Sequence, residues 1–341
     1  MEKKSSIHNE VDGIVAEKER VKPEIKKTPQ IKKYYLLMVY PELDGKQFVI
    51  DNSDVLAVLE EMKGIKSKKE HTAIDMLLNS NGGDIYSAYK IINIIREHCS
   101  DLTIIVPLYA KSAATLMALG GNRIIMGAQS ELGPLDLPTE HPIAEGRMMS
   151  ALDAVRPLEY LAATASNLAY RLGLVIRRRI QLPRKDSIEI ALRFASDYIG
   201  PIISKLDPLV VNECYRELDI AGHYARELLS RYMLAEKKNK DELSGAIAHK
   251  LVWGYPSHGF AICINEAKRI GLEVCHLSEY SDWDILWETF QMLSEETEGH
   301  ILLTEKPRAN DVIRKIRGSE SSSCEVSETE GRKGHEITGD N

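Results

Sequence analysis

Four short apolar runs, separated by segments with apolar residues at helical spacing, constrain the fold of this chain most. Strands of this kind, apolar on both faces, are typical of a parallel sheet covered on both sides. Alternation of such strands with helices indicates βαβ units. The predicted fold class is therefore α/β. The expected strands are KYYLLMVY (33–40), TAIDMLLN (72–79), LTIIVP (102–107) and RIIM (123–126), and the expected helices between them are NSDVLAVLEEMKGI (52–65) and IYSAYKIINIIREHC (85–99).

Changes in composition divide the 341 residues into regions. Residues 1–31 are charged throughout and predict a flexible arm. Residues 32–303 form the main domain, and the stretch from about 148 to 250 has helical periodicity and predicts a helical insertion. Residues 304–341 are rich in serine and glutamate with few apolar side chains, and predict a disordered tail.

Charge and cysteine content exclude several classes of protein. The formal net charge of −7 comes without a basic stripe interleaved with aromatics, so no nucleic-acid partner is expected. The arginines at 177–179 fit a solvent-exposed helix face. Five cysteines without a C-x-x-C pair argue against a disulfide framework and against a zinc site. With no signal peptide or apolar segment of membrane-spanning length in the sequence, we expect a cytoplasmic protein without a metal or cofactor.

The stretch VPLYAKSAATLMALGGNRIIMG (106–127) places Ser112 between a strand and a helix rich in small residues. A serine at this position can simply cap the helix, since serine is a favoured N-cap residue. It can also be a nucleophile, because the backbone N–H groups at a helix start favour a developing oxyanion. Taken alone, the stretch leaves both interpretations open.

A glycine turn, SNGGD (80–84), follows the preceding expected strand. Gly82 and Gly83 can adopt positive φ and present N–H groups with no side chain in the way. The turn is neither a G-x-G-x-x-G nor a Walker loop, so nucleotide binding is poorly supported.

Together, NSNGGDIYSAYKI, VPLYAKSAATLMALGGNRIIMG and SELGPLDLP resemble the serine dehydrogenase proteinase family of the Clp protease/crotonase superfamily, which is related to signal peptide peptidase A. The resemblance implies stacked βαβ units with an added helical region. It implies Ser112 as nucleophile, Asp136 and His258 as its partners, and Gly82, Gly83 and the N–H of Ala113 as the oxyanion hole. Asn81, where relatives often have proline, and SAA in place of SGG depart from the family pattern.

The function implied is a serine peptidase acting on peptides or unfolded proteins, as a homo-oligomer, with no ATPase motif in this chain. His141 is the alternative base, because its distance from Ser112 along the chain is closer to that of Clp protease. A Ser–Lys dyad would need a desolvated lysine, with Lys111 and Lys205 considered. A crotonase-like acyl-CoA enzyme and an inactive scaffold of the same fold remain alternatives.

Overall fold

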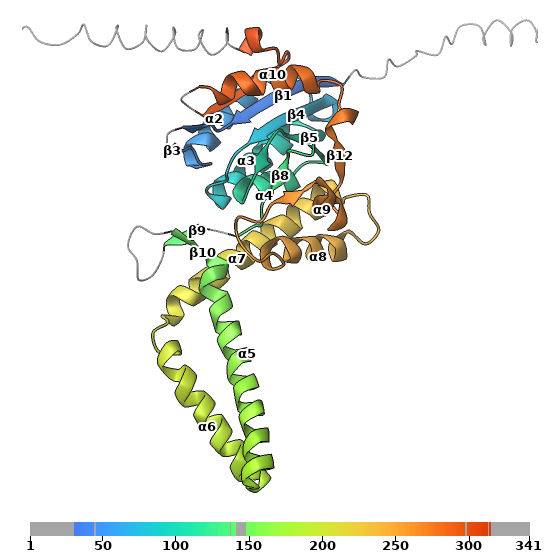
Figure 1. Ribbon diagram of the computed structural model, residues 1–341. Coiled ribbons are helices and arrows are strands. Elements are labelled where there is room, and N and C mark those ends of the chain that lie inside the picture. Colours follow the sequence, from blue (N-terminus) through green and yellow to red (C-terminus); the bar gives the residue numbers. More distant parts are fainter. Residues whose placement is uncertain are drawn as a thin grey trace, which may run out of the picture.

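The core of the computed structural model is a six-stranded sheet with strand order β12-β7-β5-β4-β1-β13 (Figure 1). The structure describes residues 31–314 except 44–45, 137, 141–147, 297–298 and 313. Every pairing in this sheet is parallel except that of β1 with β13. Its strands are β1 (Lys32–Val39), β4 (Thr72–Asn79), β5 (Asp101–Val106), β7 (Arg123–Met126), β12 (Val274–His276) and β13 (His300–Thr304).

Helices cover both faces of this sheet, which explains why its strands are apolar throughout. Alternate residues of β1 divide between two cores, with Leu36 and Met38 in one and Leu37 and Val39 in the other. The first core is closed by α2 (Asn52–Met62), α3 (Ile85–His98) and α4 (Ala113–Leu119). The second is closed by α10 (Trp283–Ser294), which lies above β1 in Figure 1.

A second, three-stranded sheet has the order β11-β8-β6 and lies beside the main sheet. Its strands β6 (Tyr109–Ala110), β8 (Glu131–Leu132) and β11 (Ile262–Cys263) are only two residues long. An isolated bridge between Ser80 and Ala110 joins β6 to the end of β4. The remaining strands pair two by two and are β2 (Glu42–Leu43) with β3 (Lys46–Gln47), and β9 (Pro138–Glu140) with β10 (Met148–Ser150).

Two long helices extend away from this core as a hairpin (Figure 1). They are α5 (Ala151–Val175) and α6 (Arg184–Ile203), joined through a π-helical turn at Ile176–Ile180. The chain then returns to the core through α7 (Pro208–Leu228), α8 (Lys240–Trp253) and α9 (Ile264–Arg269). No helix in the described part of the chain is both long and apolar enough to cross a membrane.

The predicted strands and helices of the sheet are present within a residue or two of their expected ends, apart from the helix at 52–65, which stops at Met62. Asp51, the residue before the expected helix, caps α2 by accepting a hydrogen bond from the N–H of Ser53. Pro201 lies inside α6. The expected arm at 1–31 lies outside the described residues except for Ile31.

The packed part of the chain extends past the predicted boundary at 304. Val312 is 1% exposed and belongs to the core under α10. The buried hydroxyl of Thr289 also donates a hydrogen bond to the carbonyl of Pro307. Residues 315–341, the rest of the expected tail, lie outside the described residues.

We therefore expect a chain ending at Thr304 to be less stable than a chain ending at Arg314. The shorter chain loses the burial of Val312 and one partner of Thr289, which together lower the free energy of unfolding by about 2 kcal/mol or more. Urea denaturation of both chains measures the difference. Equal unfolding midpoints would show that residues 305–314 do not contribute to the core.

Candidate active site

The three-stranded sheet brings Ser112, Asp136 and His258 to one end. Ala110, Leu132 and Ile262 lie in register across it, with β6 and β8 parallel and β11 antiparallel to β8. Ser112 and Asp136 follow the ends of β6 and β8, while His258 precedes the start of β11. Because β11 runs in the opposite direction, a residue before it lies at the end where β6 and β8 stop.

Ser112 stands at the N-cap position of α4 but does not cap the helix. Its φ of 49° and ψ of −117° lie in a region that glycine normally occupies, and its side chain makes no capping hydrogen bond. The Oγ atom is buried and has no hydrogen-bond partner among the described residues. A strained serine with a free hydroxyl at a strand-to-helix turn is the arrangement of a nucleophile elbow.

The glycine turn lies directly against Ser112. A Cβ atom on Gly82 would come within 2.9 Å of the Ser112 Cβ and 2.7 Å of the Lys111 carbonyl oxygen, so only glycine fits there. A Cβ atom on Gly83, whose φ is +146°, would overlap the Ile50 carbonyl oxygen, so glycine is required there as well.

The N–H groups of this turn are not equivalent. That of Gly82 donates to the Ser80 hydroxyl at 3.1 Å. Those of Gly83 and Ala113 donate to no acceptor in the part of the chain that the structure describes. Gly83 and Ala113 are thus the expected donors left for an oxyanion, whereas Gly82 allows the turn to approach Ser112 closely.

Asp136 is completely buried beside the start of α5. One carboxylate oxygen accepts a hydrogen bond from the N–H of Leu152 at 3.1 Å, and the other accepts one from the hydroxyl of Ser150. Burial raises the pKa of this carboxyl above its usual value, although both hydrogen bonds and the nearby His258 act in the opposite direction. The bonds hold the carboxylate in a fixed orientation.

The His258 ring lies against Asp136, with 4.0 Å between the Nδ1 atom and the nearer Asp136 oxygen. This separation is longer than a hydrogen bond, and Nδ1 has no partner among the described residues. The side chain is 41% exposed, so one edge of the ring faces solvent. A shift of about 1 Å would form an imidazole–carboxylate bond, and catalytic bonds are often long in unliganded enzymes.

Two residues outside the motifs position these groups. The buried Thr115 hydroxyl, at the third residue of α4, donates to the carbonyl of Gly133 at 2.9 Å and joins α4 to the Asp136 loop. The Arg156 guanidinium on α5 donates to the carbonyls of Trp253, Tyr255 and Pro256, just before His258. Neither role is visible in the sequence, because each depends on a contact between distant segments.

The alternatives to His258 as the general base lie in different environments or outside the described residues. His141 lies outside the described residues. Lys111 forms an ion pair with Glu131, and Lys205 is exposed beyond the end of α6. Within the described ranges, no group of three or more histidine, cysteine, aspartate or glutamate side chains could hold a metal ion.

Comparison with known proteins identifies one family that part of the chain resembles. Residues 34–154 match the family of ClpP-like SDH-type serine proteinases. The match is to this segment and leaves residues 155–341 outside it. The match includes the glycine turn, Ser112, Asp136 and the start of α5, but ends before His258. Both the predicted resemblance and the predicted fold class are confirmed.

The individual relatives are distant or short matches. Uncharacterized protein MJ1495 of Methanocaldococcus jannaschii is 23% identical over 215 residues, which cover 63% of this chain and 56% of that protein. Uncharacterized protein MJ0137 of the same organism is 34% identical over 77 residues, covering 23% of this chain and 27% of that protein. The chain therefore spans about half, or less, of the length of these curated relatives.

One solved structure is also similar, a mutant of the 1510-N membrane-bound stomatin-specific protease. It shares 14% identity and covers 47% of this chain and 69% of that chain, with a TM-score of 0.28.

The raised pKa of Asp136 leads to a prediction about stability. The folded protein holds this proton more tightly than the unfolded chain, so ionisation of Asp136 destabilises the fold as pH rises through its pKa. Asp136→Asn removes that cost; its amide oxygen can still accept from the N–H of Leu152, and its NH2 group can donate to the Ser150 hydroxyl oxygen, which reverses that bond. We expect its free energy of unfolding, relative to wild type, to increase between pH 4 and pH 7.

Urea denaturation across this pH range measures the effect. Asp153→Asn, which changes an exposed aspartate on the same helix turn, is the matched control and should show no such trend. A difference between Asp136→Asn and wild type that falls with rising pH would contradict the environment described for this carboxyl.

Proposed function

We propose that this chain is a serine peptidase in which Ser112 is the nucleophile, His258 the general base and Asp136 the residue that orients the base. The observation that carries the proposal is Ser112: strained, buried, without a capping bond and beside a turn where only glycine fits. Serine proteinase chemistry is the activity of the matched family, and the location of His258 beside Asp136 supplies its base.

In the proposed reaction, His258 takes the Ser112 proton as Oγ attacks the carbonyl carbon of a peptide bond. The tetrahedral oxyanion accepts hydrogen bonds from the N–H groups of Gly83 and Ala113. The imidazolium then gives its proton to the leaving amine, and an acyl-enzyme remains. Water, deprotonated by the same histidine, hydrolyses the ester and restores Ser112.

Each supporting residue has a definite task in this scheme. Ionised Asp136 holds the Nδ1 proton of His258 and stabilises the imidazolium. Ser150 and the N–H of Leu152 hold the carboxylate in a fixed orientation. Gly82, which has no side chain, lets the glycine turn lie directly against Ser112.

A serine-directed fluorophosphonate probe tests the nucleophile. Wild type should be labelled at Ser112, and Ser112→Ala should lose both labelling and peptide hydrolysis. The Ser112 hydroxyl makes no hydrogen bond among the described residues, so we expect the free energy of unfolding to change by less than about 1 kcal/mol.

Replacement of histidines distinguishes the two candidate bases. His258→Ala should lower kcat by orders of magnitude, since an unactivated serine is a poor nucleophile. His141→Ala is the matched control and should retain activity. The opposite result would assign the base to His141. Binding of acyl-CoA without labelling of Ser112 would favour a crotonase-like enzyme, and a folded chain that does neither would be a scaffold.

Arg156 provides a test of positioning. Arg156→Met keeps much of the aliphatic length but leaves three carbonyls ahead of His258 without their donor. We expect kcat to fall by roughly 10-fold or more with KM little changed, because a small misplacement of a catalytic group is costly. Arg156→Lys, which keeps one donor group, should be intermediate. A change in KM with kcat unchanged would show instead that Arg156 contacts the substrate.

A further inference from the structure

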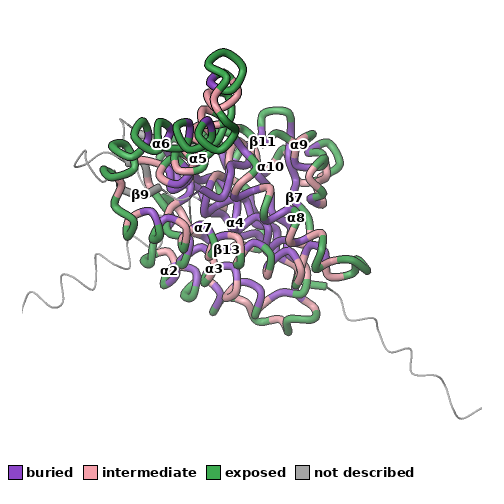
Figure 2. The backbone as a smooth tube through the Cα atoms, turned by 90° about the horizontal axis from the view of Figure 1, so that it is seen from below, coloured by how far each residue is buried: buried purple, intermediate pink, exposed green. Residues whose placement is uncertain are grey.

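The hairpin of α5 and α6 leaves much apolar surface uncovered. From Tyr160 to Val175, α5 carries a single charged residue, Arg171, which shares a narrow polar stripe with Thr164 and Asn167. The rest of this length is mostly apolar, and an apolar helix face is normally buried. Within one chain, however, α5 packs mainly on α6 along this length, and Figure 2 shows the hairpin largely exposed.

The second helix, α6, also exposes more apolar side chains than it buries. Only Ser187, Ala191, Ala195 and Ile199 of α6 are buried, a narrow stripe at helical spacing. Large apolar side chains lie on both flanks of this stripe and are exposed; they are Ile188 and Leu192 on one side and Ile190, Phe194 and Tyr198 on the other. Large contiguous apolar surfaces that are exposed on a protein mark contact sites.

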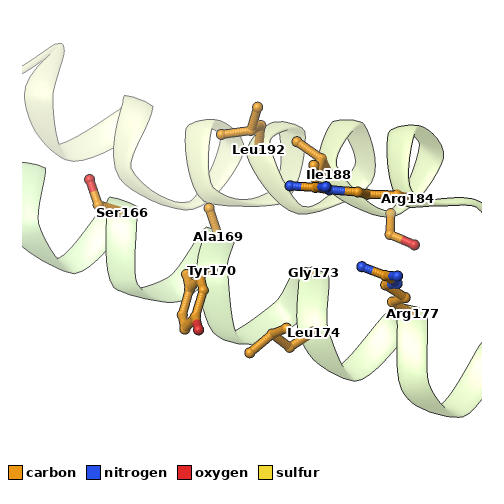
Figure 3. A pocket seen from close by; sticks show the side chains of 10 residues that line it. Ser166, Ala169, Tyr170, Gly173, Leu174, Arg177, Arg184, Ile188 and Leu192 are labelled. Atoms are coloured by element: carbon orange, nitrogen blue, oxygen red, sulfur yellow. The ribbon is translucent and has the colours of Figure 1, made fainter.

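Hollows accompany these exposed side chains. A groove of about 460 Å³ runs between the helices and is closed near the tip by Arg177 and Arg184, which come from facing helices (Figure 3). A second hollow of about 350 Å³ lies at the base of the hairpin, among Leu158, Leu206 and Tyr215. Apolar side chains from another molecule could fill both the groove and the second hollow.

The two ends of the hairpin carry opposite charge. The tip has Arg177, Arg178, Arg179, Arg184 and Lys185, all exposed, against one exposed acid, Asp186, and is therefore basic. The base has exposed Asp153, Glu159, Asp207 and Glu213 beside the exposed Lys205, and is therefore acidic. Among the described residues, none of these side chains forms an ion pair.

We propose that the hairpin pairs with the hairpin of a second copy of this chain, antiparallel, to form a four-helix bundle. In this arrangement the basic tip of each chain meets the acidic base of the other, and the exposed Ile180 enters the hollow beside Asn212. The contact is the same in both directions, as a two-fold axis requires. An anionic membrane would complement the tip but repel the base. The proposal does not depend on the peptidase activity.

Sedimentation velocity of the full chain at low micromolar concentration is the first test. Wild type should sediment as a dimer or a multiple of dimers, and Leu192→Glu should halve the mass. Arg193→Glu, on the face of α6 opposite the buried stripe, is the matched control and should leave the mass unchanged. Circular dichroism verifies that both variants are folded. A monomeric wild type, or a Leu192→Glu protein of unchanged mass, would overturn the proposal.

Disulfide trapping tests the orientation. Ile180→Cys and Asn212→Cys are placed in separate chains that lack Cys263, Cys275 and Cys324. The tip and base of one hairpin are roughly 30 Å apart along α5, so a bond between these positions must join two molecules. We expect covalent dimers only when the two chains are mixed. A tip-to-tip bond with Ile180→Cys alone would overturn the antiparallel arrangement.

Charge reversal gives an independent check. Arg178→Glu with Arg179→Glu should weaken association by 10-fold or more, and adding Glu159→Arg with Asp207→Arg should restore it. Binding of the wild-type chain to phosphatidylserine vesicles as a monomer would assign the surface to a membrane and overturn the pairing. Association unaffected by either set of reversals would overturn the proposed contact between tip and base.

Discussion

The first two turns of α5 hold both partners of the candidate nucleophile. Ser150 and the N–H of Leu152 fix Asp136, and Arg156 fixes the loop that leads to His258. The segments that carry these residues are more than a hundred positions apart in the chain, and each is irregular near the site. A loop has few internal bonds, so its geometry depends on what it is attached to. Here both loops are attached to the same rigid helix.

The site combines unfavourable features that only the surrounding structure can maintain. Ser112 has a backbone conformation that costs on the order of 1–3 kcal/mol, and Asp136 is a carboxylate without exposure to water. The opposing contribution comes from α4, in which every residue is buried, and from Thr115, which ties that helix to the Asp136 loop. The packing of the core beneath the site therefore offsets the unfavourable free energy of the strained backbone and the buried carboxylate.

Features of short range could be predicted from the sequence. The strand 72–79, the glycine turn and the serine at a strand-to-helix junction each depend on neighbours within a few residues, and the structure has all of them in place. The partners of Asp136 could not be predicted in the same way. Ser150 and Arg156 act across the fold, on carbonyls or carboxylates that sequence spacing does not bring near them. The sequence did not predict that the packed part of the chain continues past residue 304. Val312 is a single apolar residue in a polar segment, and its burial depends on α10.

Helix α5 lies in two different environments, and Pro157 marks the boundary between them. Proline has no N–H, so the carbonyl of Asp153 receives no helical bond at this point. Before it, α5 buries Ala151, Leu152 and Val155 and is joined to the site by directed hydrogen bonds; after it, the helix is mostly apolar and has no buried residue. Directed bonds fix the position of a catalytic group, whereas apolar surface provides affinity without fixing one partner geometry. The division of α5 at Pro157 therefore separates the part that requires exact orientation from the part that requires burial, and allows the two to be altered independently.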